Sequence, residues 1–407
     1  MLLICKYWYE AYKALDKTGH DYVAIIDASD AEEVSHEHES CGGMKHKFFV
    51  ESVDSIEAIT SVVNMLSIMK IDIDRVLSIG ELSQYCAGFI RDLLKCKGLS
   101  FETINNTRDK CLMKKRFKEL NLPCADFELI HERIERTLSY PLIAKPTCGF
   151  GTLNTNKINN DDDLNKYVIK FKNEKDHHLI SNGIMLEEYI SGEEYAADCL
   201  VVNSEIKLLS ISKYIIPRVQ LKDNKSKYDS VEHLKREENI EIYAKLEEMY
   251  YKIFEGFDID DCVCHLEFFL GDHNEITLSE IGSRPGGAYL NLMAKSVYGC
   301  TLYEAWFESV LNKKSEFINE SSSTEHCIIV SLIPQKSGKL LSPPSPELLN
   351  KYETLFSFDL RKKVGDSTTA FSIIDFTCFF VFKSDSLDTI KKEIISFTNS
   401  FEFEICQ

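Results

Sequence analysis

A predicted β-hairpin over residues 263–281 constrains this chain more than any other feature. The first strand, 263–270, is mostly apolar and β-branched or aromatic, the Gly-Asp-His-Asn of 271–274 is typical of a turn, and residues 275–281 resume a strand. Side chains alternate between the two faces of a strand, so the length of the loop decides which residues share a face. We expect a loop of four residues at 271–274.

Two carboxylates share one face of this hairpin. The four-residue loop places Glu267 opposite Leu278, on the same face as His265 and Glu280. Glu267 and Glu280 then lie diagonally across the strands, roughly 7–8 Å apart between backbones. Two acids so placed repel each other unless a cation lies between them, and Mg²⁺ prefers oxygen ligands and keeps phosphate oxygens in its shell. The hairpin therefore predicts a magnesium site beside a nucleotide, with His265 as a core or supporting residue rather than a ligand.

Length and composition bound the class of protein. At 407 residues the chain is long enough for two or three domains, and its apolar fraction of 44% is ordinary for a globular protein. The net charge of −18 argues against a nucleic-acid partner and an acidic membrane surface. We find no apolar run of transmembrane length, no secretory signal, and no CxxC pair among the 14 cysteines. These features predict a cytoplasmic protein with reduced cysteines.

Strand and helix patterns divide the chain into three predicted domains. Residues 1–105 alternate strand-like with helical segments, which predicts an α/β domain with a parallel sheet, and they lack the GxGxxG of a dinucleotide site. A second domain is expected over 106–311, and a third, rich in strands and aromatic residues, over 312–407. Within the second domain, 106–121 predicts one basic helix, and the lysine-rich stretch 221–240 predicts an exposed loop or lid.

Two further segments predict parts of a nucleotide site. Lys145 ends a strand before a turn that contains Gly149 and Gly151; a lysine suits phosphate, and glycines let backbone N–H groups approach phosphate oxygens. An ordinary β-turn would have the same sequence. The Leu-Glu-Glu-Tyr-Ile of 186–190, followed by the Ser-Gly-Glu-Glu of 191–194, puts acceptors beside an apolar slot that suits a purine and its ribose. Charged residues on an edge strand would give the same pattern.

The hairpin ends in Glu-Ile-Gly-Ser-Arg-Pro-Gly-Gly, residues 280–287. Arg284 lies where the strand gives way to a turn, and a guanidinium there would neutralise charge on a transferring phosphoryl group or an acyl phosphate. An ion pair between Arg284 and Glu280 or Glu267 is the simpler alternative.

Together these three pieces resemble the ATP-grasp superfamily of carboxylate–amine ligases. The resemblance lies in their order and covers roughly residues 108–311; within the superfamily it is greatest to bacterial L-amino-acid ligases, which make dipeptides. It implies an ATP-grasp fold, α/β and α+β, with an N-terminal Rossmann-like (preATP-grasp) domain and a C-terminal mixed β-rich domain. It also implies an ATP-dependent ligase that forms an amide through an acyl phosphate, uses Mg²⁺ or Mn²⁺, and takes amino acids as carboxylate and amine substrates. Homodimers are common among such proteins.

The resemblance implies a role for each matching position. The residues implied at the ATP phosphates are Lys110, Lys145 and Lys213, under a flap at Gly149 and Gly151. Those implied at adenine and ribose are Glu187, the backbone of Glu188 and Ile190, and Glu194. The implied metal ligands are Glu267 and Glu280. The residues implied at the acyl phosphate and substrate are Arg284, Gly286 and Gly287.

Two departures from the family pattern leave alternatives open. Gly282 stands where many relatives carry an asparagine ligand, which leaves the second Mg²⁺ in doubt, and the glycine flap is shorter than in biotin carboxylases, which argues against carboxylation. A biotin-carboxylase-like or purine-biosynthesis enzyme and a non-catalytic nucleotide-binding module stay open, whereas an NAD-dependent dehydrogenase lacks its glycine motif. Neither substrate is identified. The phenylalanines of the C-terminal segment are expected in the core, with a pocket for an apolar or basic side chain as the alternative: Phe371, Phe376, Phe379 and Phe380.

Overall fold

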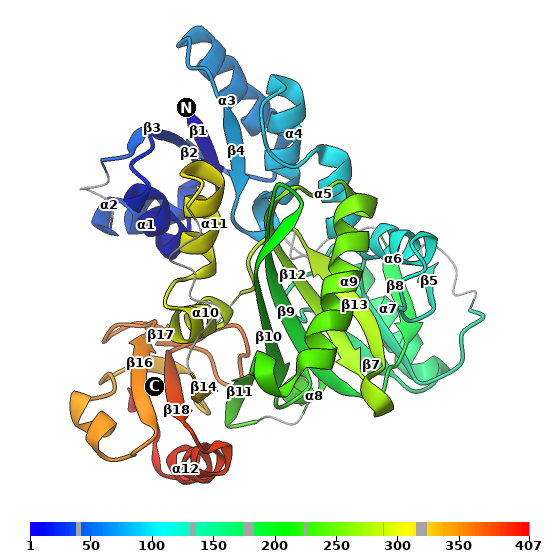
Figure 1. Ribbon diagram of the computed structural model, residues 1–407, viewed down its shortest axis with the longest axis vertical. Coiled ribbons are helices and arrows are strands. Elements are labelled where there is room, and N and C mark those ends of the chain that lie inside the picture. Colours follow the sequence, from blue (N-terminus) through cyan, green and yellow to red (C-terminus); the bar gives the residue numbers. More distant parts are fainter. Residues whose placement is uncertain are drawn as a thin grey trace.

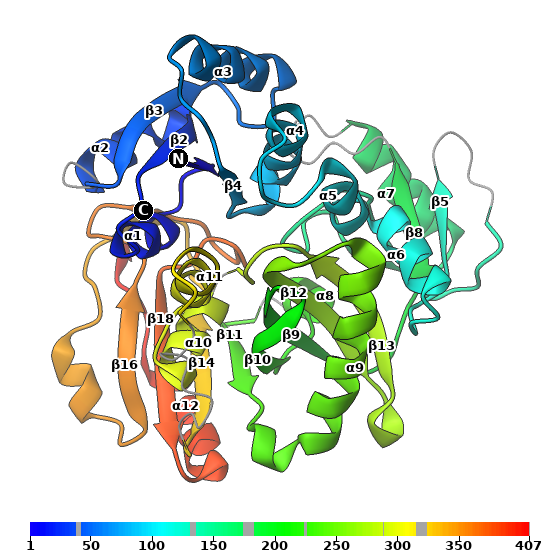
Figure 2. The ribbon, with the colours of Figure 1, turned by 45° about the horizontal axis from the view of Figure 1, so that its top comes forward.

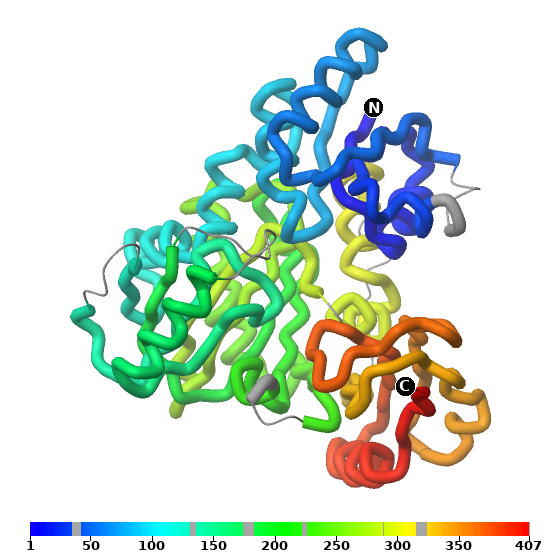
Figure 3. The backbone as a smooth tube through the Cα atoms, turned by 180° about the vertical axis from the view of Figure 1, so that it is seen from behind, coloured from blue at the N-terminus to red at the C-terminus, as the bar shows by residue number. Residues whose placement is uncertain are grey.

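The computed structural model describes residues 1–37, 42–130, 136–173, 183–223, 226–287, 289–314 and 324–406. In this part of the chain the strands form four sheets (Figure 1). The first and the last segments of the chain lie on one side of the molecule, and the cyan and teal segments that follow residue 105 lie on the other (Figure 3). No helix in the described ranges combines the length and the apolar composition needed to cross a bilayer.

The N-terminal segment forms a parallel sheet, as predicted, with the strand order β3-β2-β1-β4. Every residue of β1 and β2 is buried, because helices cover both faces of these two central strands. The strands are β1 (Leu2–Cys5), β2 (Tyr22–Asp27), β3 (Met44–Val50) and β4 (Arg75–Ser78). The helices are α1 (Tyr9–Lys17), α2 (Ala31–Glu37), α3 (Ile56–Ile68) and α4 (Gln84–Leu94).

The single basic helix predicted over 106–121 is wrong, because two helices, α5 (Phe101–Arg108) and α6 (Lys110–Glu119), meet at Asp109. Asp109 has an extended backbone, and its carboxylate accepts hydrogen bonds from the N–H groups of Cys111 at 2.9 Å and Leu112 at 3.0 Å. A side-chain cap of this kind begins a new helix. The N–H of Lys110 then donates to the carbonyl of Thr147 at 2.8 Å, which places the start of α6 against the turn that follows Lys145.

A small antiparallel sheet carries the predicted phosphate turn and purine slot. Its order is β5-β8-β6-β7, and α7 (Asp161–Asn173) packs on it through a separate hydrophobic cluster. Its strands are β5 (Phe127–Ile130), β6 (Leu142–Pro146), β7 (Asn156–Ile158) and β8 (Ile184–Glu188).

The largest sheet is antiparallel, with the order β13-β12-β9-β10-β11-β14-β18-β16. Helix α9 (Ile240–Phe257) runs along β9, β10 and β12 in both views of the ribbon and buries its apolar face in the main core (Figures 1 and 2). Helices α10 (Leu290–Tyr298) and α11 (Leu302–Leu311) also pack against this sheet. The first five strands of the list are β13 (Ile276–Gly282), β12 (Asp261–Leu270), β9 (Glu193–Val202), β10 (Glu205–Tyr214) and β11 (Tyr228–His233).

The loop predicted over 221–240 is wrong in its middle, since β11 lies inside the sheet between β10 and β14. Its residue Asp229 is buried and bound to Arg218, at the start of α8 (Arg218–Asp223), so a charged residue that indicates a loop in sequence is neutralised inside the fold.

The domain boundary predicted after residue 311 divides the largest sheet. Strand β11 precedes that residue and β14 follows it, yet the two strands pair with each other. Phe379 and Phe380 are buried in β18, which confirms the core expectation for these two, whereas Phe371 is 42% exposed. The remaining elements are β14 (His326–Leu332), β15 (Gly338–Leu340), β16 (Leu355–Leu360), β17 (Ser367–Thr368), β18 (Cys378–Ser384), α12 (Leu387–Ser400) and β19 (Ile405–Cys406).

Candidate active site

Glu267 and Glu280 lie directly opposite each other on the β12–β13 hairpin, which corrects the predicted register. Leu270 pairs with Ile276, so the loop runs over 271–275 and is one residue longer than expected. That change alone would place Glu267 opposite Ser279 and send Glu280 to the other face.

A β-bulge at Ser279 restores the shared face. Leu278 pairs with Phe268, Ser279 is the extra residue, and Glu280 pairs with Glu267. A bulge adds one residue to one strand and so shifts the alternation of side chains by one position. The two carboxylates are therefore closer than the predicted diagonal pair, and Leu278 joins the main core instead of their face.

A cavity of about 590 Å³ adjoins this pair of carboxylates. Its walls come from the hairpin, from the small sheet and from the loops that follow β1 and β4. The predicted site residues that line it are Lys110, Lys145, Gly149, Gly151, Glu187, Glu188, Ile190, Glu194, Glu267, Glu280, Arg284 and Gly287. The predicted residues outside its lining are Lys213 and Gly286.

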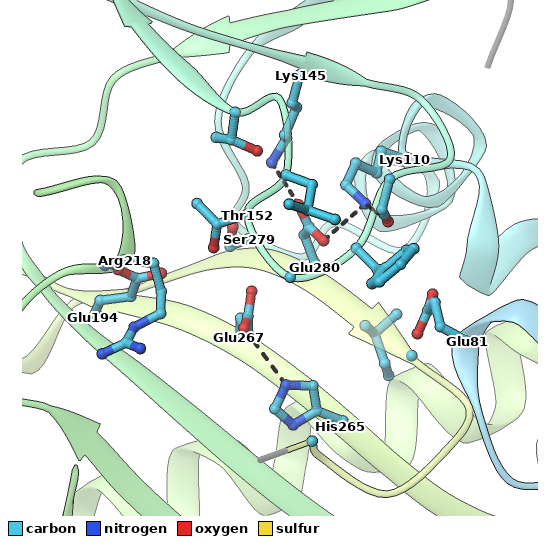
Figure 4. A pocket seen from close by; sticks show the side chains of 18 of the residues that line it. Glu81, Lys110, Lys145, Thr152, Glu194, Arg218, His265, Glu267, Ser279 and Glu280 are labelled. Carbon is cyan, nitrogen blue, oxygen red and sulfur yellow. Dashed lines mark hydrogen bonds and ion pairs between the residues drawn. The ribbon is translucent and has the colours of Figure 1, made fainter. Parts of the chain in front are cut away.

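Two lysines hold Glu280. Lys110 and Lys145 approach its two carboxylate oxygens at 3.0 Å and 2.8 Å, and Figure 4 shows Glu280 between them. Burial by itself raises the pKa of Glu280, but the two ammonium groups outweigh burial and hold the pKa well below its usual range. Lys145 also lies 2.6 Å from Glu187, so anionic and cationic groups alternate along this wall.

Lys114 belongs to the same network and was missed in the sequence. It is fully buried, and its Nζ lies 2.9 Å from Oε2 of Glu187. Lys110 and Lys114 are four residues apart on α6, so they share one face of the helix. That spacing was the available signal. Glu187 is therefore bound by Lys114 and Lys145 at the cavity wall, and its contact with adenine stays a prediction.

Glu194 lies near Glu267, across the paired strands β9 and β12. Burial and the charge of Glu267 raise the pKa of Glu194 to about 7. Its carboxylate accepts a hydrogen bond from the N–H of Arg218 at 2.7 Å. The Arg218 guanidinium lines the cavity and forms a two-point ion pair with Asp229, at 2.6 Å and 2.5 Å. No local pattern in the sequence connects these residues, which lie on different elements.

His265 contacts Glu267, in keeping with the supporting role predicted for it. Its Nε2 lies 3.5 Å from Oε1 of Glu267, and its Nδ1 lies 3.2 Å from the buried Asp198. Figure 4 marks the contact between His265 and Glu267. Gly286 completes this corner: its N–H donates to Asp198 at 2.8 Å, and a Cβ there would come within 2.8 Å of the His265 ring. A side chain at position 286 would therefore clash with the residues that support Glu267 behind the cavity wall.

Lys213 is not brought to the cavity, which corrects its predicted phosphate contact. It pairs with Tyr195 across β10 and β9, and its ammonium binds Glu193. Glu194, the next residue after Glu193, faces the cavity. Paired residues share a face and neighbours alternate, so Lys213 points to the opposite side of the sheet from Glu194.

Arg284 pairs with Glu81 rather than with Glu267 or Glu280. Glu81 begins a short 3₁₀ helix (Glu81–Ser83) after β4, and Arg108 lies 3.1 Å from its other oxygen. Burial by itself raises the pKa of Glu81, but the guanidinium groups of Arg284 and Arg108 outweigh burial and hold it at about 2. Glu81 was missed because it reaches the cavity only through the contact of the N-terminal segment with the hairpin, and Arg108 was missed because its partner is Glu81.

This ion pair predicts a pH-dependent part of the stability. The folded pKa of Glu81 lies below its ordinary value, so its contribution is present above pH 4.5 and is lost as the pH falls toward 2. We expect Glu81→Gln to lower the free energy of unfolding by about 2 kcal/mol near neutral pH and by much less at about pH 3. Urea denaturation over a pH series measures this, with the exposed Glu102→Gln as control; parallel curves for wild type and Glu81→Gln would contradict it.

The donor set at the hairpin fits a hard divalent cation. Glu267 and Glu280 face each other at the cavity, and carboxylate oxygens are ligands that Mg²⁺ prefers. Gly282 pairs with His265 and offers no third side-chain ligand. Within the described ranges, no group of three or more His, Cys, Asp and Glu residues is suited to a metal ion. Phosphate oxygens and water would therefore complete the shell, as is usual for Mg²⁺.

Comparisons with known proteins agree with this geometry. Residues 138–291 match the family model of the ATP-grasp domain. The chain is 28% identical over 266 residues to the L-arginine-specific L-amino acid ligase of Bacillus subtilis. The aligned region covers 64% of this chain and 63% of that protein. It resembles the crystal structure of an L-amino acid ligase from Bacillus licheniformis with a TM-score of 0.77 and 17% identity, over 100% of this chain and 98% of the other.

A second solved structure shows how widely the fold is shared. The chain resembles the biotin carboxylase–β,γ-ATP complex from Campylobacter jejuni with a TM-score of 0.67 and 14% identity, over 99% of this chain and 92% of the other. The fold is thus the ATP-grasp fold with mixed α/β content, as the resemblance implied, and its two main sheets are the parallel N-terminal sheet and the large antiparallel sheet. The match to the ATP-grasp domain covers residues 138–291, and the chain spans 63% of the length of the Bacillus subtilis enzyme.

Proposed function

We propose that this protein is an ATP-dependent carboxylate–amine ligase that joins two amino acids through an acyl phosphate. The observation that carries the proposal is the pair Glu267 and Glu280, opposite each other at a cavity where Lys110 and Lys145 bind Glu280. These groups provide a site for Mg²⁺ and for the phosphates of ATP. The similarity to L-amino acid ligases in sequence and in fold supports amide formation over the other reactions of the superfamily.

In this reaction the substrate carboxylate attacks the γ-phosphorus of ATP, an O–P bond forms, and ADP leaves. The amine of the second amino acid then attacks the acyl carbon, phosphate leaves, and the amine loses its proton. Mg²⁺, when bound, neutralises phosphate charge during the transfer.

The residues of the chain contribute alignment and charge. Glu267 and Glu280 would hold the metal, and Lys110 and Lys145, which lie at Glu280, would offset the negative charge of the phosphates. Arg284 would face the acyl phosphate, and Glu81, which is also bound by Arg108, holds its guanidinium in place. The turn with Gly149 and Gly151 would cover the phosphates and exclude water, which would otherwise hydrolyse the acyl phosphate.

Purified protein tests this proposal. We expect ATP, Mg²⁺ and a pool of L-amino acids to give phosphate release that depends on the amino acids, together with products whose mass is that of two amino acids less one water. Colorimetric phosphate measurement and mass spectrometry detect the two. Phosphate release that depends on bicarbonate and not on amino acids would instead indicate the carboxylase alternative. ATP binding without any turnover would indicate the non-catalytic alternative.

A further inference from the structure

Apolar side chains from three distant parts of the chain meet at the cavity. We call this set the apolar wall, and its members are Trp8, Leu82, Tyr303, Ile373, Ile374 and Phe376. Leu82 follows Glu81, the partner of Arg284, so it lies beside the predicted substrate position. Figure 4 shows Glu81 on the opposite side of Glu267 from Glu194 and Arg218, which separates this part of the cavity from the part expected to hold the ribose.

The C-terminal part of the wall reaches the phosphate turn. A Cβ on Gly151 would lie 3.6 Å from Cγ2 of Ile374, and the Phe376 ring lies 6.2 Å from that of Tyr289, centre to centre. Tyr303 keeps its hydroxyl away from the wall by donating to the carbonyl of Ile79 at 3.1 Å. The wall thus offers hydrocarbon and aromatic surface next to the position where a substrate carboxylate would be activated.

The charged groups near the wall already have partners. Lys6 pairs with Asp27 and Asp30, and Glu81 pairs with Arg108 and Arg284. The other glutamates that line the cavity are likewise engaged by lysine, histidine or backbone N–H groups: Glu187, Glu188, Glu194, Glu267 and Glu280.

Asp375, between two wall residues in sequence, does not line the cavity. It pairs with Lys362 and accepts a hydrogen bond from the N–H of Thr369 at 2.7 Å. A cationic substrate side chain would therefore meet no carboxylate that lacks an ion-pair or hydrogen-bond partner among the described lining residues, and burying a charge without a partner is costly.

We propose that the apolar wall receives the side chain of an amino acid substrate, so that the enzyme ligates amino acids with apolar side chains in preference to cationic or anionic ones. This inference rests on the proposed ligase function. Removing an apolar side chain from water against these residues favours binding, whereas a charged side chain loses its hydration without gaining a partner.

Single amino acids offered in turn with ATP, Mg²⁺ and glycine test the inference. We expect leucine, methionine and phenylalanine to support phosphate release with a kcat/KM at least about tenfold above that of arginine, lysine and aspartate. A higher kcat/KM for a charged amino acid would overturn the inference and leave the ligase function standing. No release with any amino acid would overturn the ligase function and this inference with it.

A matched pair of variants tests the wall itself. Ile374→Glu places a carboxylate on the wall, and because Ile374 is 49% exposed the change does not disturb the core. We expect it to lower kcat/KM for leucine about tenfold and to raise kcat/KM for arginine. Ile395→Glu, on α12 and 57% exposed, makes the same change away from the cavity and should alter neither value. Equal leucine and arginine values in Ile374→Glu and wild type would overturn the assignment of the wall.

Discussion

Glu280→Gln is expected to lower amino-acid-dependent phosphate release about 10³-fold, because the variant loses a metal ligand and the anionic partner of Lys110 and Lys145. An amide at this position has nearly the same shape as the carboxylate but cannot balance two ammonium groups or hold Mg²⁺ as tightly. Steady-state phosphate release over a range of Mg²⁺ concentrations measures the effect. Removing the metal from the wild type with a chelator should reduce release to a similar extent.

Glu275→Gln provides the control for this variant. Glu275 is exposed in the loop of the same hairpin, so the same chemical change there should leave the rate within about twofold of wild type. A Glu280→Gln enzyme with the wild-type rate and the wild-type Mg²⁺ dependence would show that the hairpin carboxylates do not hold the metal, and the proposed mechanism would be abandoned.

Lys114→Met is expected to lower the free energy of unfolding by about 3 kcal/mol, because it leaves Glu187 buried with one of its two cationic partners removed. Methionine retains most of the length of the lysine side chain, so little of the loss is due to a cavity. Urea denaturation followed by circular dichroism measures it.

Two further variants separate charge from packing. Lys115→Met changes the exposed neighbour of Lys114 and should alter the free energy of unfolding by no more than about 0.5 kcal/mol. Glu187→Gln in the Lys114→Met background should recover part of the loss, since it removes a buried carboxylate that has lost one of its two cationic partners. If the loss in free energy of unfolding of the double variant equals the sum of the losses of the two single variants, the Lys114–Glu187 contact contributes no pairwise stabilisation.

The sequence predicted most of the local structure that surrounds the site. The N-terminal alternation of strand and helix and the hairpin at 263–281 are present in the fold. These segments were predictable because apolar periodicity and turn residues act over a few neighbouring positions. The single helix at 106–121 failed for the opposite reason, since one capping residue, Asp109, outweighed a continuous basic pattern.

The pairing partners of the site could not be predicted in the same way. Glu81 binds Arg284 from 203 positions away in the sequence, and Arg218, at the start of α8, binds Asp229 on β11. A charge in a sequence has many possible partners, and only packing of the segments selects one of them. The charged residues of 221–240 predict a loop for the same reason, because the sequence does not show that Asp229 of β11 is neutralised by Arg218.

By itself, the sequence determined which chemical groups this protein brings to its site: two hairpin carboxylates, a lysine before a glycine turn, and an arginine after the second carboxylate. Only the tertiary structure decided how they are arranged. The bulge at Ser279 set Glu280 opposite Glu267, and strand alternation turned Lys213 away from the cavity. The reason is that residue type fixes charge and donor atoms, whereas register and long-range packing fix which of those atoms lie within reach of one another.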